Sequence, residues 1–378
     1  MKILHVIAYI DPTFGGPSVV VRDMAEASRA IGNEVHIATT CASMDSDSNN
    51  KEGTFFKDGI TVHFFKRTYP FSWFCSPTMN QWLLINVSNF DILHLHVPFT
   101  APLFFGGKSA LLSGRPYVVT LHGVLDPWSL RQKSWKKIPY FYLFDRNILN
   151  RASFLHVTST SESEQIVKLK VKVDIRMIRP CVPVVNIDRI NRNSNEQLRI
   201  LCIARLDPVK AHKVLFEAVA HLIQQGFNIV LDIAGDGDAK FKKVLKSYVF
   251  KLGISNAVIW HGHVDAEKKL SLYQNAWCFA LLSFHESFGL AAAEAMAAGL
   301  PVVVSDQVGL SIDVKNYAAG LVVKTNDAFA AANAFKLLFN FKEANAFGNR
   351  ALKLANELYN SQIFSDQLKQ LYLDAINS

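Results

Sequence analysis

The sequence predicts an α/β protein made of two doubly wound parallel sheets, and three observations lead to this prediction. The chain has 378 residues, and at about 150 residues per domain this length favours two domains. Half of the residues are hydrophobic and 19% are charged, a composition typical of globular proteins. Short apolar runs alternate with longer helical patterns almost throughout, as expected of repeated βαβ units.

Two series of apolar runs supply the predicted strands. The runs are rich in Val and Ile, as parallel strands buried on both faces are. The first series comprises residues 3–8, 35–39, 60–65, 92–96, 117–121 and 154–158. The second comprises residues 200–204, 229–234, 258–260, 277–282, 302–305 and 321–323.

A break in this patterning separates the two series. Pro180 and Pro183 precede a polar run at 188–197 in which strand and helix patterns both stop. The spacing of apolar residues near the end of the chain predicts a last helix that folds back across the first domain. The predicted parts are an N-terminal domain at 1–180, a linker at 181–197, a C-terminal domain at 198–361 and the returning helix at 362–378.

The net charge and the cysteines indicate which binding partners and which cellular compartment to expect for this protein. The net charge of +8 suits an anionic partner such as a nucleotide diphosphate, a nucleic acid or an acidic membrane, and equally suits simple solubility. The five cysteines are scattered and form no C-x-x-C pair. We therefore expect neither a metal site nor a disulfide framework, and a location in the reducing cytoplasm fits best. Run 3–8 is too short for a signal peptide, and no uncharged run reaches the ~18 residues of a membrane span. We therefore expect a cytoplasmic protein, with peripheral contact to the inner face of a membrane left open.

The stretch 283–306, SFHESFGLAAAEAMAAGLPVVVSD, carries the strongest functional signal. It predicts a helix at 288–298, capped by Ser287, directly after the strand at 277–282. The helix dipole and free N–H groups at such an N-terminus favour an anion such as a diphosphate. The N–H groups concerned are those of Phe288, Gly289 and Leu290.

Two carboxylates flank the start of this helix. Glu286 and Glu294 are eight residues apart, too far to share one face of one continuous helix. We place Glu286 in the loop and Glu294 in the second turn. Carboxylates accept hydrogen bonds from hydroxyls, so sugar and ribose are natural partners. A solvated helix face is the alternative for Glu294.

Two cations follow the strand at 200–204. Arg205 and Lys210 can stabilise negative charge as it develops on a phosphate leaving group. Two ordinary surface cations are the alternative.

The first domain offers weaker candidates. The pair Gly15–Gly16 follows the first strand, and His122 follows the strand at 117–121; a tight turn and a structural histidine are the alternatives. The segment 128–137, WSLRQKSWKK, mixes tryptophan with cations. It predicts an interfacial helix, an acceptor-binding face or an ordinary amphipathic helix. Residues 71–74 are unusually apolar for a loop.

Three apparent motifs carry little weight. The run 235–237 lacks the third glycine of a dinucleotide fingerprint, which argues against a nicotinamide-dependent oxidoreductase. Asp236 and Asp238 imitate a metal-binding D-x-D without further ligands nearby. His261 and His263 are more typical of strand ends than of ligands.

In order and spacing, these motifs resemble the retaining GT-B glycosyltransferases of family 4, the group 1 transferases. The resemblance covers nearly the whole chain. Its most specific element runs from Glu286 to Glu294, with ESFGL inside, and next comes ARLDPVK at 204–210. Ala204 and Ala211 depart from the family pattern, in which glycine is common at both positions.

The resemblance implies a GT-B fold, with two Rossmann-like domains facing a central cleft, and a role for each candidate. Arg205, Lys210 and Glu286 would form the catalytic set, with the cations on the donor diphosphate and Glu286 on the sugar hydroxyls. The implied donor-binding residues are Gly16 near phosphate and acceptor, His122 near the transferred sugar, Val264 at the base, Phe288, Gly289 and Leu290 through their N–H groups, and Glu294 at the ribose.

The implied function is retaining transfer of a hexose from a nucleotide-diphosphate sugar to a saccharide or lipid-linked acceptor, without metal ion or cofactor. UDP-glucose is the favoured donor and GDP-mannose the second. The expected setting is bacterial polysaccharide or glycolipid assembly. A UDP-sugar epimerase of the same fold, a nicotinamide-dependent oxidoreductase and a non-catalytic nucleotide-sugar sensor remain as alternatives.

Overall fold

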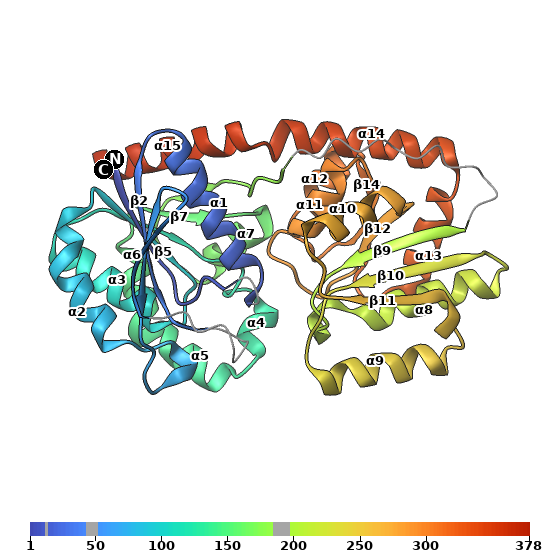
Figure 1. The fold of residues 1–378 in the computed structure, drawn as a ribbon, viewed down its shortest axis with the longest axis horizontal. Coiled ribbons are helices and arrows are strands. Elements are labelled where there is room, and N and C mark those ends of the chain that lie inside the picture. Colours follow the sequence, from blue (N-terminus) through green and yellow to red (C-terminus); the bar gives the residue numbers. More distant parts are fainter. Residues whose placement is uncertain (12–13, 43–51, 184–196) are drawn as a thin grey trace. The chain divides into compact units, whose positions relative to one another are not determined.

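The computed structural model describes residues 1–11, 14–42, 52–183 and 197–378, and the chain divides into two compact units (Figure 1). Unit 1 comprises Met1–Pro180 and Ser361–Ser378, and unit 2 comprises Cys181–Asn360. Most of the predicted linker, 184–196, lies outside the described residues. Each unit contains a sheet with helices packed on it, which is the predicted α/β class.

The sheet of unit 1 has eight strands in the order β3-β4-β2-β1-β5-β6-β7-β8. Their bounds are β1 Lys2–Val6, β2 Glu34–Thr40, β3 Gly53–Lys57, β4 Ile60–Phe65, β5 Ile92–His96, β6 Tyr117–Thr120, β7 Phe154–Val157 and β8 Ile175–Met177. Strands β3 and β4 pair antiparallel. The other strand pairs are parallel, and from β4 to β7 the order is that of a doubly wound sheet.

The two edge strands, β3 and β8, were not predicted. Every residue of β3 is exposed, so its sequence, GTFFK, has no buried face to produce an alternating pattern. Strand β8 has three residues, which is too few for a periodic signal.

The helices of unit 1 cover this sheet. Their bounds are α1 Gly16–Ala30, α2 Pro77–Asn86, α3 Ala101–Leu112, α4 Pro127–Arg131, α5 Ser134–Tyr140, α6 Arg146–Asn150, α7 Thr160–Lys168 and α15 Ser361–Asn377. Helix α15 packs against α1, β5 and β6 and buries Phe364, Leu368 and Leu371. Unit 1 also contains the short 3-10 turn η2 at Phe71–Trp73 and the π-helical turn η4 at Phe141–Asp145.

The segment at 128–137, expected as one helix, is divided between α4 and α5. Gln132 leaves the helical region and Lys133 has a φ of 55°. The left-handed backbone at Lys133 ends the first helix and starts the second in a new direction.

The sheet of unit 2 has six parallel strands in the order β11-β10-β9-β12-β13-β14. They are β9 Leu198–Ile203, β10 Ile229–Ala234, β11 Val258–Gly262, β12 Cys278–Leu281, β13 Val302–Ser305 and β14 Gly320–Val323. All six were predicted. Its helices are α8 His212–Gln224, α9 Ala239–Lys251, α10 Ala266–Asn275, α11 Leu290–Ala297, α12 Ser311–Tyr317, α13 Ala328–Leu338 and α14 Phe341–Leu358.

The strand order places a topological switch point between β9 and β12. These strands are neighbours in the sheet, yet the chain leaves β9 toward β10 on one side and reaches β13 from β12 on the other. Loops diverge at such a point and leave a crevice beyond the carboxyl ends of the strands. Arg205 follows β9 and Glu286 follows β12, so both flank this point.

Candidate active site

The loop after β9 is built by short local hydrogen bonds. The Asp207 carboxylate accepts a hydrogen bond from Val209 N at 2.9 Å and starts the turn Pro208–Lys210. Leu206 N donates to Asp236 O at 2.9 Å, which ties this loop to the one after β10. Arg205 is exposed and forms no ion pair within the described chain. Its guanidinium is therefore available to an anion.

Lys210 and Glu286 form an ion pair. The loops that carry them are joined by a hydrogen bond from Phe284 N to Val209 O at 2.8 Å. The Lys210 side chain is 15% exposed and that of Glu286 is 20% exposed, so both are accessible at the surface of unit 2. The structure thus brings two predicted catalytic residues into direct contact from loops 76 residues apart.

The backbone after Glu286 is held by the loop that follows β13. Glu286 N donates to Gln307 O at 3.1 Å, Gly309 N donates to Glu286 O at 2.9 Å, and Leu310 N donates to Phe288 O at 3.0 Å. These bonds fix the path of the chain into α11.

Helix α11 begins two residues later than predicted. Its N-cap is Gly289, with a φ of 104° and no side-chain cap, rather than Ser287. A Cβ at Gly289 would lie 2.8 Å from a methyl group of Val308, so both the dihedral angle and the space require glycine. Within the described chain, no hydrogen bond uses the N–H groups of Phe288, Gly289 and Leu290. An uncapped N-terminus of this kind suits an anion.

Glu294 has two protein partners that the sequence did not reveal. Its carboxylate accepts a hydrogen bond from the Tyr273 hydroxyl at 2.8 Å and pairs with Lys269. Tyr273 and Lys269 lie four residues apart on α10 and therefore share a face. The carboxylate is thus fixed in position, and its predicted role at a ribose stays a prediction.

The loops after β10 and β11 lie close to the Arg205 loop. A Cβ at Gly235 would lie 2.0 Å from the carbonyl oxygen of Ala204, so this glycine serves backbone packing. Asp236 pairs with Lys242 at 3.0 Å, and Asp238 caps α9, which explains the metal-like D-x-D spacing by structural roles. Val264 is half-buried just past β11 and packs on the hydrophobic core.

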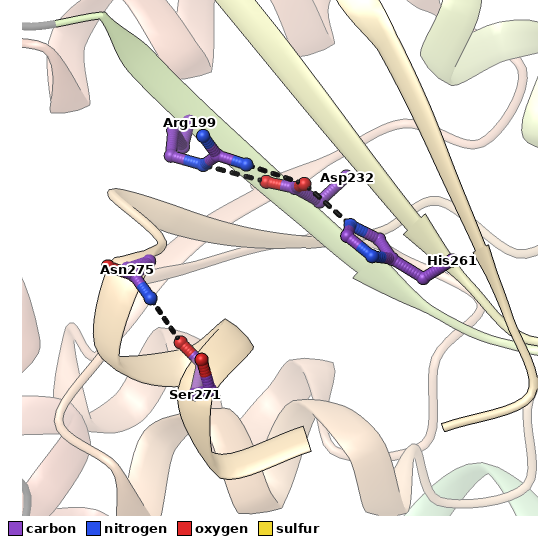
Figure 2. A network of polar contacts seen from close by, with 5 residues as sticks. All are labelled: Arg199, Asp232, His261, Ser271 and Asn275. Atoms are coloured by element: carbon purple, nitrogen blue, oxygen red, sulfur yellow. Dashed lines mark hydrogen bonds and ion pairs between the residues drawn. The ribbon is translucent and has the colours of Figure 1, made fainter. Parts of the chain in front are cut away.

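A polar network centred on the buried carboxylate of Asp232 crosses the sheet. Figure 2 shows Asp232 on β10 between Arg199 on β9 and His261 on β11. Arg199 donates two hydrogen bonds to the carboxylate, at 3.0 and 2.8 Å, and His261 Nε2 donates a third at 2.7 Å. His261 is therefore a structural residue, as the sequence suggested. Farther along, the Asn275 amide donates to Ser271 O at 2.7 Å and closes the last turn of α10 (Figure 2).

In unit 1, Gly15 is the N-cap of α1 and Gly16 is the first residue of this helix. Gly15 has a φ of 95° and gives α1 no side-chain cap. A Cβ at Gly16 would meet no heavy atom within 4 Å. The packing of unit 1 therefore does not require a glycine at position 16.

His122 stands at the carboxyl end of β6 with a φ of 55°. Its Nε2 lies 3.2 Å from Nδ1 of His96, whose Nε2 lies 3.0 Å from Nδ1 of His5. Burial lowers the pKa of His122 to about 3, so the ring is neutral at pH 7. Glu162 holds the next peptide by accepting a hydrogen bond from Gly123 N at 2.6 Å. Neither His96 nor Glu162 was predicted, although the alternation LHLH in β5 places two histidines on one face.

A second chain of hydrogen bonds crosses the same sheet. His156 Nε2 lies 2.9 Å from Ile178 O, and because a carbonyl can only accept, this nitrogen carries the proton. The Thr120 hydroxyl therefore donates to His156 Nδ1, and His94 Nε2 donates to Thr120. His94 Nδ1 then accepts from the Tyr372 hydroxyl at 2.8 Å. The chain links α15 to three strands of unit 1.

His5, His94 and His96 are the candidate metal ligands of the described chain. Their ligand atoms lie within 4.8 Å of one another. Both nitrogens of His94 already form hydrogen bonds, and His5 and His96 bond to each other. A cation would have to replace these bonds, so the cluster is best explained as a hydrogen-bonded layer of the core.

Comparison with known proteins assigns both halves of the chain. Residues 14–185 match the profile of Glycosyltransferase Family 4, and residues 185–354 match that of Glycosyl transferases group 1. This chain is a group 1, family 4 glycosyltransferase. An uncharacterized glycosyltransferase of Methanocaldococcus jannaschii is 27% identical, with 87% of each chain covered. A D-inositol 3-phosphate glycosyltransferase of Streptomyces avermitilis is 25% identical, with 85% of this chain and 75% of the relative covered.

The solved structures confirm that this glycosyltransferase has the GT-B fold. Sucrose-phosphate synthase from Thermosynechococcus elongatus superposes with a TM-score of 0.80 at 21% identity, covering 99% of this chain and 98% of the other. Anabaena HepE, solved in complex with UDP and glucose, superposes with a TM-score of 0.78 at 18% identity, covering 98% and 99%. The predicted family and fold are confirmed. The roles of the individual site residues, and the cleft between the domains, stay predictions.

Proposed function

We propose that this glycosyltransferase moves a hexose from a UDP-sugar to a saccharide or lipid-linked acceptor, with retention of anomeric configuration and without a metal ion or cofactor. The observation that carries the proposal is the ion pair between Lys210 and Glu286, in which Glu286 lies three residues before Gly289, the N-cap of α11, which has no side-chain cap. Cation, carboxylate and free N–H groups are the three kinds of group that a sugar diphosphate requires.

The charged groups suggest a division of labour. Arg205 and Lys210 would neutralise the diphosphate as the anomeric C–O bond breaks, assisted by the N–H groups of Phe288, Gly289 and Leu290. Glu286 would accept hydrogen bonds from sugar hydroxyls and hold the Lys210 ammonium in place. The acceptor hydroxyl would attack from the face that the leaving diphosphate occupies and give up its proton to that phosphate.

UDP-glucose is the favoured donor and GDP-mannose the second. The UDP and UDP-glucose complexes of HepE support uridine, since that protein shares the fold over 98% of this chain. Val264 and Glu294 are the proposed contacts to base and ribose, and Gly16 and His122 are the proposed contacts from unit 1.

A nucleotide-release assay tests the proposal. The enzyme is incubated with UDP-glucose, UDP-galactose and GDP-mannose, each with and without EDTA and with a panel of saccharide and lipid-linked acceptors. We expect acceptor-stimulated release of UDP that EDTA leaves unchanged, and a product whose anomeric configuration by NMR equals that of the donor. An inverted product would overturn retention, and loss of activity in EDTA would overturn metal independence.

The same assay separates the second candidate, a UDP-sugar epimerase. That enzyme would convert the donor to a new UDP-sugar or release UDP with no acceptor present. Such a product, formed at a rate that acceptors do not change, would replace the transferase assignment of this site.

A further inference from the structure

One stretch of unit 1 carries most of the net positive charge of this enzyme, because it contains few acidic residues. Residues 59–161 contain ten lysine or arginine residues and three aspartates, so this stretch carries nearly all of the net charge of +8. Two of the aspartates lie beneath the surface, since Asp126 is 6% exposed and Asp145 is fully buried. The third, Asp91, is exposed and accepts a hydrogen bond from Lys2 N. The basic residues are Lys66, Arg67, Lys108, Arg115, Arg131, Lys133, Lys136, Lys137, Arg146 and Arg151.

An aromatic groove lies within this basic part of the unit. It has a volume of about 630 Å³ and is lined by residues from η2, α5 and η4. At its floor the Tyr140 ring lies 5.0 Å from that of Trp73 and 4.9 Å from that of Phe144. Its rim is unusually exposed for apolar side chains, with Tyr69 at 83%, Trp135 at 74% and Leu143 at 72%.

Cations alternate with these apolar side chains. The Lys136 ammonium lies 4.7 Å from the centre of the Trp135 ring, and the Arg67 guanidinium lies 5.4 Å from that of Phe71. Lys133, between α4 and α5, is exposed as well. Aromatic rings that can enter the headgroup region, with cations beside them, fit an anionic lipid surface.

We propose that this face of unit 1, defined by Tyr69, Phe71, Trp135, Leu143, Lys133 and Lys136, is the surface by which the enzyme binds an anionic lipid bilayer. The apolar side chains enter the headgroup region and the lysines contact lipid phosphates. Charge complementarity selects this occupant, since the face presents cations and aromatic rings with no exposed carboxylate among its lining residues. The proposal does not depend on the donor or on the reaction.

Flotation of the full-length enzyme with vesicles tests this proposal. Vesicles of phosphatidylcholine alone are compared with vesicles that also contain phosphatidylglycerol, at low and high salt. We expect the enzyme to float with the anionic vesicles, to dissociate at high salt and to show a blue shift of tryptophan fluorescence on binding. Equal binding to neutral vesicles, or no binding to either, would overturn the proposal; the second result would point to a protein partner.

Paired variants identify the surface. Lys133→Gln with Lys136→Gln should weaken binding to anionic vesicles about thirtyfold, at about 1 kcal/mol for each lysine. Trp135→Ser with Leu143→Ser should abolish the fluorescence shift. The matched control is Phe250→Ser with Lys251→Gln on α9, where Phe250 is 76% exposed. The proposal fails if the unit 1 variants bind like the control.

Vesicle-free measurements keep this inference separate from the proposed reaction. All substituted side chains are exposed, so the variants should melt like the wild type. Release of UDP in the presence of a water-soluble acceptor should be unchanged in all of them. Loss of vesicle binding with retained release therefore tests the surface alone, whereas lack of release in the wild type tests only the transferase assignment.

Discussion

Lys210 and Glu286 hold each other in place before any substrate arrives. Each side chain is partly exposed, so the diphosphate and the sugar that we propose as ligands would meet groups whose geometry the protein already fixes. Preorganisation of this kind stabilises developing charge without reorganisation during the reaction. In the proposed complex, the Lys210 ammonium would offset the repulsion between the Glu286 carboxylate and the diphosphate.

Removal of the cation should affect the rate far more than the fold. For Lys210→Ala we expect turnover to fall by about 10²–10³-fold, as when one preorganised donor to developing charge is lost. The melting temperature should change little, because the pair is partly exposed to solvent. Steady-state kinetics and calorimetry measure the two effects. Lys213→Ala, three residues on, is the control and should keep wild-type turnover; an unchanged rate in Lys210→Ala would contradict the assigned role.

Substitution of Gly16 tests a role in substrate binding without disturbing the fold. A Cβ at this position meets nothing within 4 Å, and its φ is not positive, so Gly16→Ala should fold with unchanged or slightly higher stability. If Gly16 lies at the donor phosphate and acceptor, the added methyl group should raise the KM or lower kcat by at least about tenfold, the cost of roughly 1.4 kcal/mol. Wild-type kinetics in a stable variant would remove Gly16 from the site.

At the scale of elements, Asp232 connects the three strands whose loops carry Arg205, Asp236 and Val264. It is 2% exposed and joins Arg199 to His261. Asp232→Ala should lower the free energy of unfolding by about 3 kcal/mol, because it leaves the guanidinium without its buried partner. Urea denaturation measures this. The control Glu357→Ala removes an exposed pair with Lys353 on one helix and should cost no more than about 0.5 kcal/mol; equal losses would contradict the argument.

Helix α15 is joined to the sheet of unit 1 by a hydrogen bond from the Tyr372 hydroxyl to His94 on β5. This hydroxyl must donate to His94 Nδ1, because the remaining bonds of that chain fix His94 and His156 as Nε2–H tautomers. Tyr372→Phe should therefore cost about 1–2 kcal/mol by leaving a buried acceptor unpaired. Denaturation measures the loss, and the tautomers of His94 and His156 can be read from long-range ¹H–¹⁵N spectra. An Nδ1–H signal from His156 would refute the assigned chain.

At the scale of the whole molecule, the buried histidines make the two units differ in acid sensitivity. Burial lowers the pKa of His5 and His122 to about 3 and that of His63 and His156 to about 4. Burial also lowers the pKa values of His94 and His96 well below 6.5. All six lie in unit 1.

The direction of this pH effect follows from the linkage between proton binding and folding. Each of these histidines takes up its proton more readily when unfolded, so its stabilising contribution is complete above about pH 6.5 and is lost as the pH falls toward its folded pKa. For each histidine, the free energy of unfolding falls by at most about 1.4 kcal/mol for each pH unit by which the pH is lowered. Asp145 and Glu162 act in the opposite direction, because burial raises the pKa of Asp145 to about 7 and that of Glu162 above its usual value. Their contributions are lost as the pH rises through the folded-state pKa values. Six histidines outweigh two carboxyls.

We therefore expect unit 1 to open at a higher pH than unit 2, where burial lowers the pKa of His212 to about 4. Hydrogen exchange followed by mass spectrometry measures this on peptides from β5 and β12 as the pH is lowered from 7. Protection should be lost first in β5. Simultaneous loss in both strands, or earlier loss in β12, would contradict the histidine argument.

Among the described residues, no helix is both long and apolar enough to cross a membrane. The membrane contact that we propose is argued from the exposed aromatic and basic side chains of unit 1, the unit that also contains the six buried histidines.

The sequence by itself determined the buried parallel strands of both sheets, because parallel strands buried on both faces require continuous apolar runs that are local in the chain. It also predicted where a site would lie, because a residue that follows a parallel strand must lie at the carboxyl edge of the sheet. Arg205, Lys210 and Glu286 were predicted in this way. An exposed edge strand such as β3 has no such local signal.

Only the tertiary structure decided which side chains meet. Lys210 reaches Glu286, Tyr273 reaches Glu294, and Tyr372 reaches His94 across 76, 21 and 278 residues respectively. No periodicity records such pairs, since they depend on strand order, register and rotamer. The start of α11 was decided in the same way, because the loop after β13 holds Phe288 and forces Gly289 into a conformation that only the folded unit requires.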